Sequence, residues 1–188
     1  MAKGGGGNQL RIIGGEWRGR KLTFPDVEGL RPTTDRVRET LFNWLQPVIQ
    51  GARCLDLFAG SGALGMEALS RGAAVVQFID RERRAVQSLK ENLALLRSTR
   101  GEVLQVDALS YLRGEARPFD VVFLDPPFRQ GLLQPCLEQL CQGGWLAEHG
   151  RIYIEVEQEG GEPEMPEGWE MVRRKQAGQV IYGLAAHQ

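Results

Sequence analysis

Cysteine and histidine are scarce in this sequence, and no long apolar run is present. The 188 residues include three cysteines, without a CxxC pair, and two histidines, so no zinc or histidine-rich metal site is expected. An odd cysteine count favours reduced core thiols over a disulfide framework. No segment approaches the ~18 apolar residues that span a membrane, and the start MAKGGGGNQL has no apolar signal region. We therefore expect a cytoplasmic protein with no membrane contact and no metal.

The chain also lacks a strong net charge. Its formal charge of −1 means that the protein is not basic overall, so nucleic-acid binding would depend on local patches. Residues 1–24 carry five basic side chains and one acidic one, whereas residues 155–170 carry seven glutamates and no Lys or Arg. This asymmetry indicates an anionic partner near the N-terminal end.

A length of 188 residues suits one domain with a substantial core. The glycine-rich residues 1–9 predict a flexible arm, and residues 10–188 predict a single domain. Residues 10–50 predict a small N-terminal β-ribbon followed by a helix, and residues 51–188 an α/β core. The ribbon strands are expected at 10–13 and 21–24, on either side of a basic, glycine-containing turn, and the helix near residue 35.

Strand and helix patterns alternate through the core, which predicts right-handed βαβ units and a parallel sheet. Apolar strands are expected at 54–58, 74–79, 103–106, 121–124 and 152–156, with clear helical periodicity at 82–97 and 131–142. The tail differs, because segments 169–174 and 180–184 predict an antiparallel hairpin. A mostly parallel seven-stranded sheet that ends in such a hairpin fits the Rossmann-like class I methyltransferase fold better than the dehydrogenase fold.

A glycine-rich turn follows the first core strand. Gly60, Gly62 and Gly65 satisfy GxGxxG, a pattern that lets a ligand approach the backbone at a helix N-terminus. The pattern alone leaves a nicotinamide dinucleotide and S-adenosylmethionine both open. Asp56 favours the second, because a carboxylate four residues before the first glycine can reach an ammonium group and would repel a pyrophosphate.

Two further acids end the next two strands. Asp80 can accept hydrogen bonds from ribose hydroxyls, and Asp107 can accept one from an adenine amino group. Either could instead cap a helix, and for Asp107 that alternative stays open. Since ligands of open α/β sheets bind at the carboxyl ends of the strands, three acids there suit a cationic sulfonium nucleoside.

The fourth core strand runs into Asp125-Pro126-Pro127-Phe128. The Asp125 carboxylate and the Pro126 carbonyl can accept from the two N–H groups of a flat amine, and Phe128 can stack on the ring that bears it. Prolines fix φ and so keep that carbonyl oriented. The alternative is that Asp-Pro-Pro only terminates the strand. At this place in the sheet, the motif predicts methyl transfer to a nucleobase amine.

These motifs, with the segment 31–45 that begins Arg-Pro-Thr-Thr-Asp, resemble the bacterial 16S rRNA (guanine(966)-N(2))-methyltransferases of the RsmD type. The resemblance covers about residues 10–184 and implies methylation of one guanine in small-subunit rRNA during assembly. It implies a catalytic group of Asp125, Pro126 and Phe128. It implies a site for S-adenosylmethionine, whose product is S-adenosylhomocysteine, at Asp56, Phe58, Gly60, Gly62, Asp80, Arg81, Asp107 and Ala108, and less directly at Thr33, Arg36 and Arg38.

The resemblance implies 16S rRNA as the partner, within a small-subunit assembly particle, and a monomer is expected. Basic side chains could grip its phosphates, with Trp17 stacking on a base; the alternative is solvated charges with Trp17 packed beneath. The RNA-binding residues we predict are Arg11, Arg18, Arg20, Lys21 and Arg38. Other functions remain open: an adenine or cytosine amino-methyltransferase on DNA or other RNA, an NAD-dependent oxidoreductase, or a non-catalytic RNA-binding factor.

Overall fold

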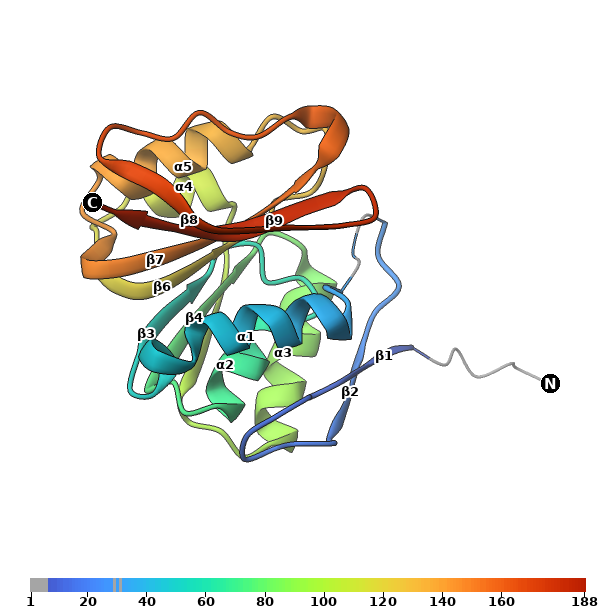
Figure 1. Cartoon of the computed structure of the whole chain (residues 1–188). Coiled ribbons are helices and arrows are strands. Elements are labelled where there is room, and N and C mark those ends of the chain that lie inside the picture. The colour runs from blue at the N-terminus through green and yellow to red at the C-terminus, as the bar shows by residue number, and fades with distance from the viewer. Residues whose placement is uncertain (1–6, 29, 31) are drawn as a thin grey trace.

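The computed structural model describes residues 7–28, 30 and 32–188. The predictions that concern residues 1–6 of the arm and Arg31 lie outside the described residues. Within them, a seven-stranded sheet is covered by helices on both faces (Figure 1). Its strands are β3 (Arg53–Asp56), β4 (Val75–Asp80), β5 (Gly101–Gln105), β6 (Phe119–Leu124), β7 (Leu146–Glu157), β8 (Trp169–Ala177) and β9 (Val180–His187).

The sheet has the order β5-β4-β3-β6-β7-β9-β8. Strands β3 to β7 pair in parallel, whereas β9 lies antiparallel to both β7 and β8. The predicted mostly parallel sheet with a C-terminal antiparallel hairpin is therefore confirmed. Strand β7 is longer than the predicted 152–156, because its polar first half pairs with β6 through a register shift that apolar periodicity does not reveal.

The helices divide between the two faces of the sheet (Figure 1). One apolar cluster joins the sheet to the first three helices, and a second cluster joins its other face to the last two. The predicted helices near residue 35, at 82–97 and at 131–142 are confirmed, with small differences at their ends. The helices are α1 (Asp35–Ile49), α2 (Ala63–Ser70), α3 (Arg83–Leu95), α4 (Ala108–Leu112) and α5 (Leu133–Gln142). No helix in the described ranges is both long and apolar enough to span a membrane.

Side-chain alternation in the central strands decides which residues face α1. Phe123 of β6 and Tyr153 of β7 belong to the cluster on the α1 side, whereas Leu124 and Ile154 belong to the other cluster. Leu124 and Ile154 are also direct partners in the β6–β7 register. Because strand side chains alternate between faces, the residues that follow Leu124 and Ile154 are directed toward the α1 side.

The N-terminal ribbon is fixed to α2 by two buried side chains. Glu67, which is fully buried, accepts a hydrogen bond from the Ile13 amide at 2.9 Å, and the Ser70 hydroxyl accepts one from the Trp17 amide at 2.9 Å. Gly15 has φ +80°, and a Cβ there would overlap the Ser70 carbonyl, so only glycine fits. The turn of the ribbon therefore lies at the C-terminal end of α2. The ribbon strands are β1 (Asn8–Arg11) and β2 (Lys21–Phe24).

Candidate active site

The predicted acids gather where the parallel strands end. Asp56 is the last residue of β3 and Asp80 the last residue of β4, and Asp125 directly follows β6. Strands β4, β3 and β6 are consecutive neighbours in the sheet. Residues up to 69 positions apart in the sequence thus lie together at the carboxyl-terminal end of the parallel strands, as the βαβ pattern predicted.

The glycine turn connects the carboxyl-terminal end of β3 to α2. Gly62 occupies the N-cap of α2 with φ 84°, a left-handed conformation that favours glycine. A Cβ on Gly65 would overlap the Phe78 ring of β4, so this glycine allows the helix to pack closely on the sheet. The Gly60 amide donates to Asp80 Oδ2 at 2.8 Å, which ties the turn to the end of β4.

Asp56 is enclosed within this turn. It is 2% exposed, and its Oδ2 accepts a hydrogen bond from the Gly65 amide at 3.0 Å. Burial raises the pKa of Asp56 to about 7, an effect that the Gly65 hydrogen bond opposes and the Asp80 charge reinforces. Burial likewise raises the pKa of Asp80. The carboxyl groups of Asp56 and Asp80 could therefore both accept hydrogen bonds from a cationic group bound here.

Asp107 caps the N-terminus of α4. Its Oδ1 accepts from the Ser110 amide at 3.0 Å and its Oδ2 from the Ser110 hydroxyl at 2.6 Å, so it caps α4. These hydrogen bonds lower the pKa of its carboxyl group. Each carboxylate oxygen keeps a second lone pair, so the predicted adenine contact stays a prediction. Of its neighbours in the prediction, Ala108 is buried and Arg81 is exposed.

The Asp-Pro-Pro-Phe corner offers an acceptor and an aromatic ring together. Asp125 is partly exposed, Pro126 is buried, and the Phe128 side chain is 38% exposed. The pKa of Asp125 is raised well above its usual range, first by burial and then by the nearby charges of Glu155 and Asp56. Phe58, half-buried, belongs to the preceding glycine turn. The ring of Phe128 is open to a stacking partner.

Glu155 of β7 is a site residue that the sequence analysis did not find. Its carboxyl group and that of Asp125 are close enough for each to shift the pKa of the other, and Glu155 Oε2 accepts from the Tyr153 hydroxyl at 3.0 Å and from the Thr33 hydroxyl at 3.4 Å. Burial raises the pKa of Glu155, and its contacts with these three side chains oppose the rise. The signal was present, since Glu155 is a charged residue within the apolar strand predicted at 152–156, but it was counted with the acidic segment 155–170.

Thr33 of the Arg-Pro-Thr segment lies at the same end of the sheet as the acids. This side chain is 7% exposed, and its hydroxyl contacts Glu155. Thr34 caps α1 by accepting from the Val37 amide. Arg36, in the first turn of α1, is exposed. Thr33 is thus brought to the acids, and the cofactor role predicted for Thr33 and Arg36 stays a prediction.

The predicted RNA-binding residues have different environments. The arginines at 11, 18 and 20 and the neighbouring lysine are exposed, whereas Arg38 is 1% exposed and pairs with Glu67 at 3.4 Å and Asp35 at 2.6 Å. The RNA-binding prediction for Arg38 was wrong, because a guanidinium enclosed by its own ion pairs cannot reach phosphates. For Trp17 the alternative, a ring packed beneath the basic side chains, is borne out, since Trp17 is 7% exposed and packs under Arg100. The exposed residues are Arg11, Arg18, Arg20 and Lys21.

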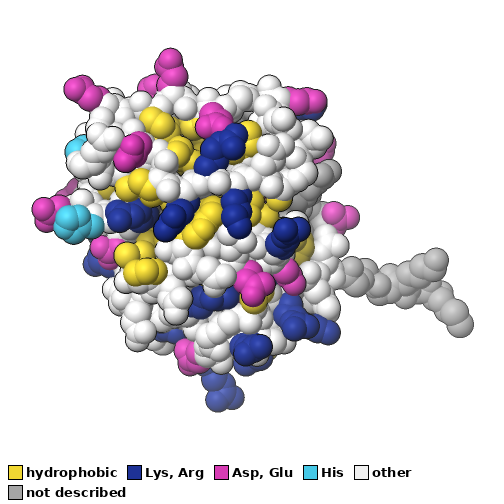
Figure 2. All heavy atoms as spheres, in the orientation of Figure 1, with side chains coloured by type: hydrophobic (Ala, Val, Ile, Leu, Met, Phe, Trp, Pro, Cys, Tyr) yellow, Lys and Arg dark blue, Asp and Glu magenta, His cyan; other side chains and the backbone are white. Residues whose placement is uncertain are grey.

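A second basic group, which the sequence analysis missed, lies on β8. Arg173, Arg174 and Lys175 are exposed, and Figure 2 shows a row of Lys and Arg side chains across the face formed by β8 and β9. Lys175 is level with Tyr182 of β9, which is level with Glu155 of β7. At about 4.8 Å between strands, the backbone of Lys175 lies about 10 Å from that of Glu155. The turn of the ribbon lies at the C-terminal end of α2 and is therefore farther from the acids than β8 is.

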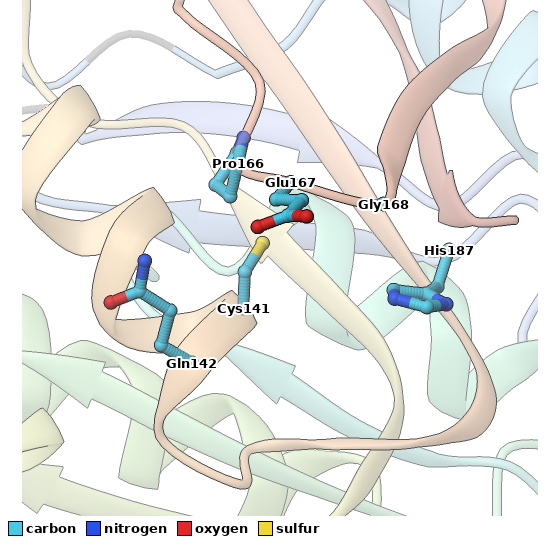
Figure 3. Close-up of a pocket in the computed structure, with 6 residues that line it drawn as sticks. All are labelled: Cys141, Gln142, Pro166, Glu167, Gly168 and His187. Carbon is cyan, nitrogen blue, oxygen red and sulfur yellow. The ribbon is translucent and has the colours of Figure 1, made fainter.

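Figure 3 shows a hollow at the other end of the sheet. It is formed by the end of α5 and the ends of the C-terminal hairpin, and no predicted site residue lines it. Burial raises the pKa of the Cys141 thiol to about 12, so the hollow holds no thiolate nucleophile. The cysteines at 54, 136 and 141 are free thiols, as predicted. In the described ranges, no group of three His, Cys, Asp or Glu side chains is placed to hold a metal ion. The hollow is lined by Cys141, Gln142, Pro166, Glu167, Gly168 and His187.

Comparisons with known proteins agree with the resemblance stated above. The model of the family described as conserved hypothetical protein 95 matches residues 10–186. Ribosomal RNA small subunit methyltransferase D of Escherichia coli K12 is 55% identical over 179 residues, which are 95% of this chain and 90% of that protein. The protein of the same name from Haemophilus influenzae is 47% identical over 181 residues, or 94% and 93% of the two chains. The solved structure of yhhF from Escherichia coli has a TM-score of 0.90 and 51% identity, over 96% of this chain and 99% of that one.

Proposed function

Because the chain belongs to the conserved hypothetical protein 95 family, the RsmD family, we propose that it is an rRNA methyltransferase of the small subunit. In this proposal it transfers a methyl group from S-adenosylmethionine to the N2 amine of one guanine in 16S rRNA. The observation that carries the proposal is that Asp125, Phe128 and the glycine turn all lie at the carboxyl-terminal end of neighbouring parallel strands. The curated relatives named above support the rRNA substrate.

The residues present fit a cationic sulfonium cofactor. Asp56 and Asp80 flank the glycine turn, and both carry hydrogen bonds from its backbone amides. The carboxylate of Asp56 would hold the ammonium end, directly or through water, and Asp80 would hold the ribose hydroxyls. Gly60 and Gly62 would let the cofactor approach the backbone. When bound, this cofactor would supply the activated methyl group and leave as S-adenosylhomocysteine, and the methylated amine would release one proton.

The Asp125 corner would orient the amine that receives the methyl group. The lone pair of an exocyclic amine is delocalised into the base, so the amine is a poor nucleophile in its planar form. Acceptors at Asp125 and at the Pro126 carbonyl would hold the two N–H groups so that the lone pair is localised on nitrogen and directed toward the methyl group. They would also favour the positive charge that develops on nitrogen. Phe128 would stack on the base after it has turned out of its helix.

Two basic surfaces would hold the RNA. The ribbon residues Arg18, Arg20 and Lys21 and the β8 residues Arg173 and Lys175 are exposed. Such side chains contact phosphates and so fix the RNA without reading its sequence. The small-subunit particle is the proposed setting of the reaction.

The direct test is incubation of the protein with methyl-labelled S-adenosylmethionine and either 16S rRNA or partly assembled small subunits, followed by nucleoside analysis. The proposal predicts label in N2-methylguanosine. Label in a methylated adenosine or cytidine would contradict the guanine assignment, and no label in any substrate would contradict the reaction itself.

Calorimetric titration separates this proposal from the dinucleotide alternative. S-adenosylhomocysteine is expected to bind and NAD is not. Tight binding of NAD with no binding of S-adenosylhomocysteine would show that the glycine turn serves a different cofactor.

A further inference from the structure

Two carboxyl groups, not one, lie at the proposed amine site. Leu124 and Ile154 are direct partners in the parallel β6–β7 register, so the residues that follow them, Asp125 and Glu155, lie side by side on the α1 face. The two carboxyl groups are close enough for each to shift the pKa of the other. Since Asp125 was assigned to the exocyclic amine, a second acceptor beside it is available for the next atom along the edge of the base.

The protein holds Glu155 in a fixed orientation. The Tyr153 hydroxyl, from a side chain with no exposed surface, and the Thr33 hydroxyl, 7% exposed, both donate to Oε2 at 3.0 and 3.4 Å. Burial raises the pKa of Tyr153 well above its usual range, so this phenol keeps its proton and remains a donor. Neither hydroxyl occupies Oε1, and Glu155 is only partly buried. A preoriented acceptor that a ligand can reach is a recognition element.

The edges of the purine bases differ at the atom beside the exocyclic amine. In guanine, N1 carries a hydrogen next to the N2 amine, so the two groups are adjacent donors. In adenine, N1 is an acceptor next to the N6 amine. With Glu155 ionised, the two adjacent carboxyl groups match guanine, and Glu155 places an acceptor against the N1 acceptor of adenine, which leaves both without a partner.

We propose that Glu155 determines base specificity, by accepting a hydrogen bond from N1–H of the target guanine while Asp125 accepts one from the N2 amine. This inference rests on the proposed function. Glu155 thereby explains, from the structure, a choice of base that the Asp-Pro-Pro-Phe motif alone leaves open. Tyr153 and Thr33 are positioning residues, because they act on the base only through Glu155.

The test compares two target bases in small subunits reconstituted from 16S rRNA that carries either guanine or 2-aminopurine at the target position. 2-Aminopurine keeps the amine at C2 but has no hydrogen on N1. The wild type is expected to methylate guanine at least about tenfold faster, as kcat/KM, than 2-aminopurine. Glu155→Gln, whose amide can donate to a bare N1, is expected to reduce that preference by about tenfold or more.

The ratio of the two bases isolates the N1 contact. 2-Aminopurine also lacks O6, but the loss of O6 is common to both enzymes and cancels when their preferences are compared. Glu157→Gln is the matched control, because Glu157 lies two residues along the same strand and pairs with Arg129 at 3.5 Å. It is expected to keep the wild-type preference.

An unchanged preference in Glu155→Gln would overturn the inference and leave the proposed function standing, provided that the wild type methylates the guanine particle in the same assay. If the wild type methylates neither particle, the proposed function fails and the inference with it. If Glu155→Gln does not fold, Tyr153→Phe decides. Loss of that hydroxyl is expected to reduce the guanine preference about threefold or more with unchanged affinity for S-adenosylhomocysteine, and full retention of the preference would overturn the inference.

Discussion

At the scale of single residues, the site is defined by carboxyl groups whose pKa values are raised by burial. Asp56, Asp125 and Glu155 all have raised pKa values, with burial as the largest cause. Their negative charges, which lie close together where the parallel strands end, repel one another and raise the pKa values of Asp56 and Asp125 further. A bound cation, or N–H donors from a base, would offset the same repulsion.

Asp56 gives a prediction for stability against pH. Its pKa is about 7 in the folded protein, above the ~3.9 of an unfolded chain. The folded state therefore keeps a proton that the unfolded state has lost, and stability falls as the pH rises toward 7. We expect Asp56 to contribute a loss of about 3 kcal/mol between pH 5 and pH 8.

Urea unfolding at both pH values, for the wild type and Asp56→Asn, measures this contribution. Asparagine can still accept from the Gly65 amide but does not titrate. The variant is expected to lose less stability than the wild type over this range, by about the stated amount. Parallel pH dependences in the two proteins would contradict the buried titration.

Asp125 gives a prediction for activity. Asp125→Ala removes the acceptor that orients the amine, and the loss of one preorganised polar group typically costs about 10²–10³ in kcat. Methylation is therefore expected to fall at least about 100-fold, while RNA affinity in a filter-binding assay stays within about twofold because phosphates supply most of it. Activity near the wild-type rate in Asp125→Ala would remove this residue from the mechanism.

The sequence predicted residues whose role follows from their position on a strand. Asp56, Asp80 and Asp125 were found because apolar runs locate strand ends. Burial of a polar side chain was not predictable in the same way. Arg38 is buried because Glu67, 29 residues later, pairs with it, and no local pattern around residue 38 records that partner.

At the scale of secondary-structure elements, one glutamate joins the N-terminal ribbon, α1 and α2. Glu67 has no exposed surface and accepts from the amides of Ile13 and Gly14 and from the guanidinium groups of Arg38 and Arg71. Its removal would leave buried donors and positive charge without an acceptor. Such losses typically cost 3–5 kcal/mol.

Glu67→Ala is therefore expected to lower the free energy of unfolding by about 3–5 kcal/mol. Glu91→Ala is the control, because Glu91 is exposed on α3 and accepts an exposed side-chain hydrogen bond from Gln87, and it should cost less than about 0.5 kcal/mol. Urea denaturation of the three proteins measures both values. Equal effects of the two substitutions would show that the buried ion pairs do not fix the ribbon.

Strand β8 gives a prediction for RNA binding. Arg173 and Lys175 lie level with Tyr153 and Glu155, two strands away, so they are placed to hold phosphates near the target base. Their joint replacement by Ala is expected to lower kcat/KM about tenfold and to reduce the slope of log affinity against log salt by about 1.5 to 2. The control pair is Arg113→Ala with Arg117→Ala, two exposed arginines between α4 and β6.

If the control pair matches the β8 pair in both measurements, the RNA surface does not include β8. The ribbon triple Arg18→Ala, Arg20→Ala and Lys21→Ala in the same assay tests the surface that the sequence predicted. That triple is expected to weaken RNA binding and to leave the affinity for S-adenosylhomocysteine unchanged.

At the scale of the whole molecule, the α/β architecture followed from the alternation of apolar strands and amphipathic helices. The position of the ribbon did not follow, because it depends on hydrogen bonds between residues 53 to 56 positions apart, at Glu67 and Ser70. The pairing of Asp125 with Glu155 was missed for a similar reason. It requires the exact β6–β7 register, which a register shift in the first half of β7 obscures.

The outer strand of the hairpin bears on oligomeric state. Strand β8 lies at the edge of the sheet and carries three consecutive exposed cationic side chains, at 173–175. Charges on an edge strand oppose pairing with the edge of another copy. We therefore expect a monomer of 20.9 kDa in sedimentation velocity, and a concentration-independent dimer would contradict this expectation.

The central claim is that this chain methylates the N2 amine of one small-subunit guanine through Asp125. Mass spectrometry of 16S rRNA nucleosides, from cells that lack the chain and carry either the wild-type gene or Asp125→Ala, tests it most directly. The wild type is expected to restore one N2-methylguanosine at a single position, and Asp125→Ala to leave that guanine unmodified. Unmodified guanine with the wild type, or full methylation with Asp125→Ala, would contradict the claim.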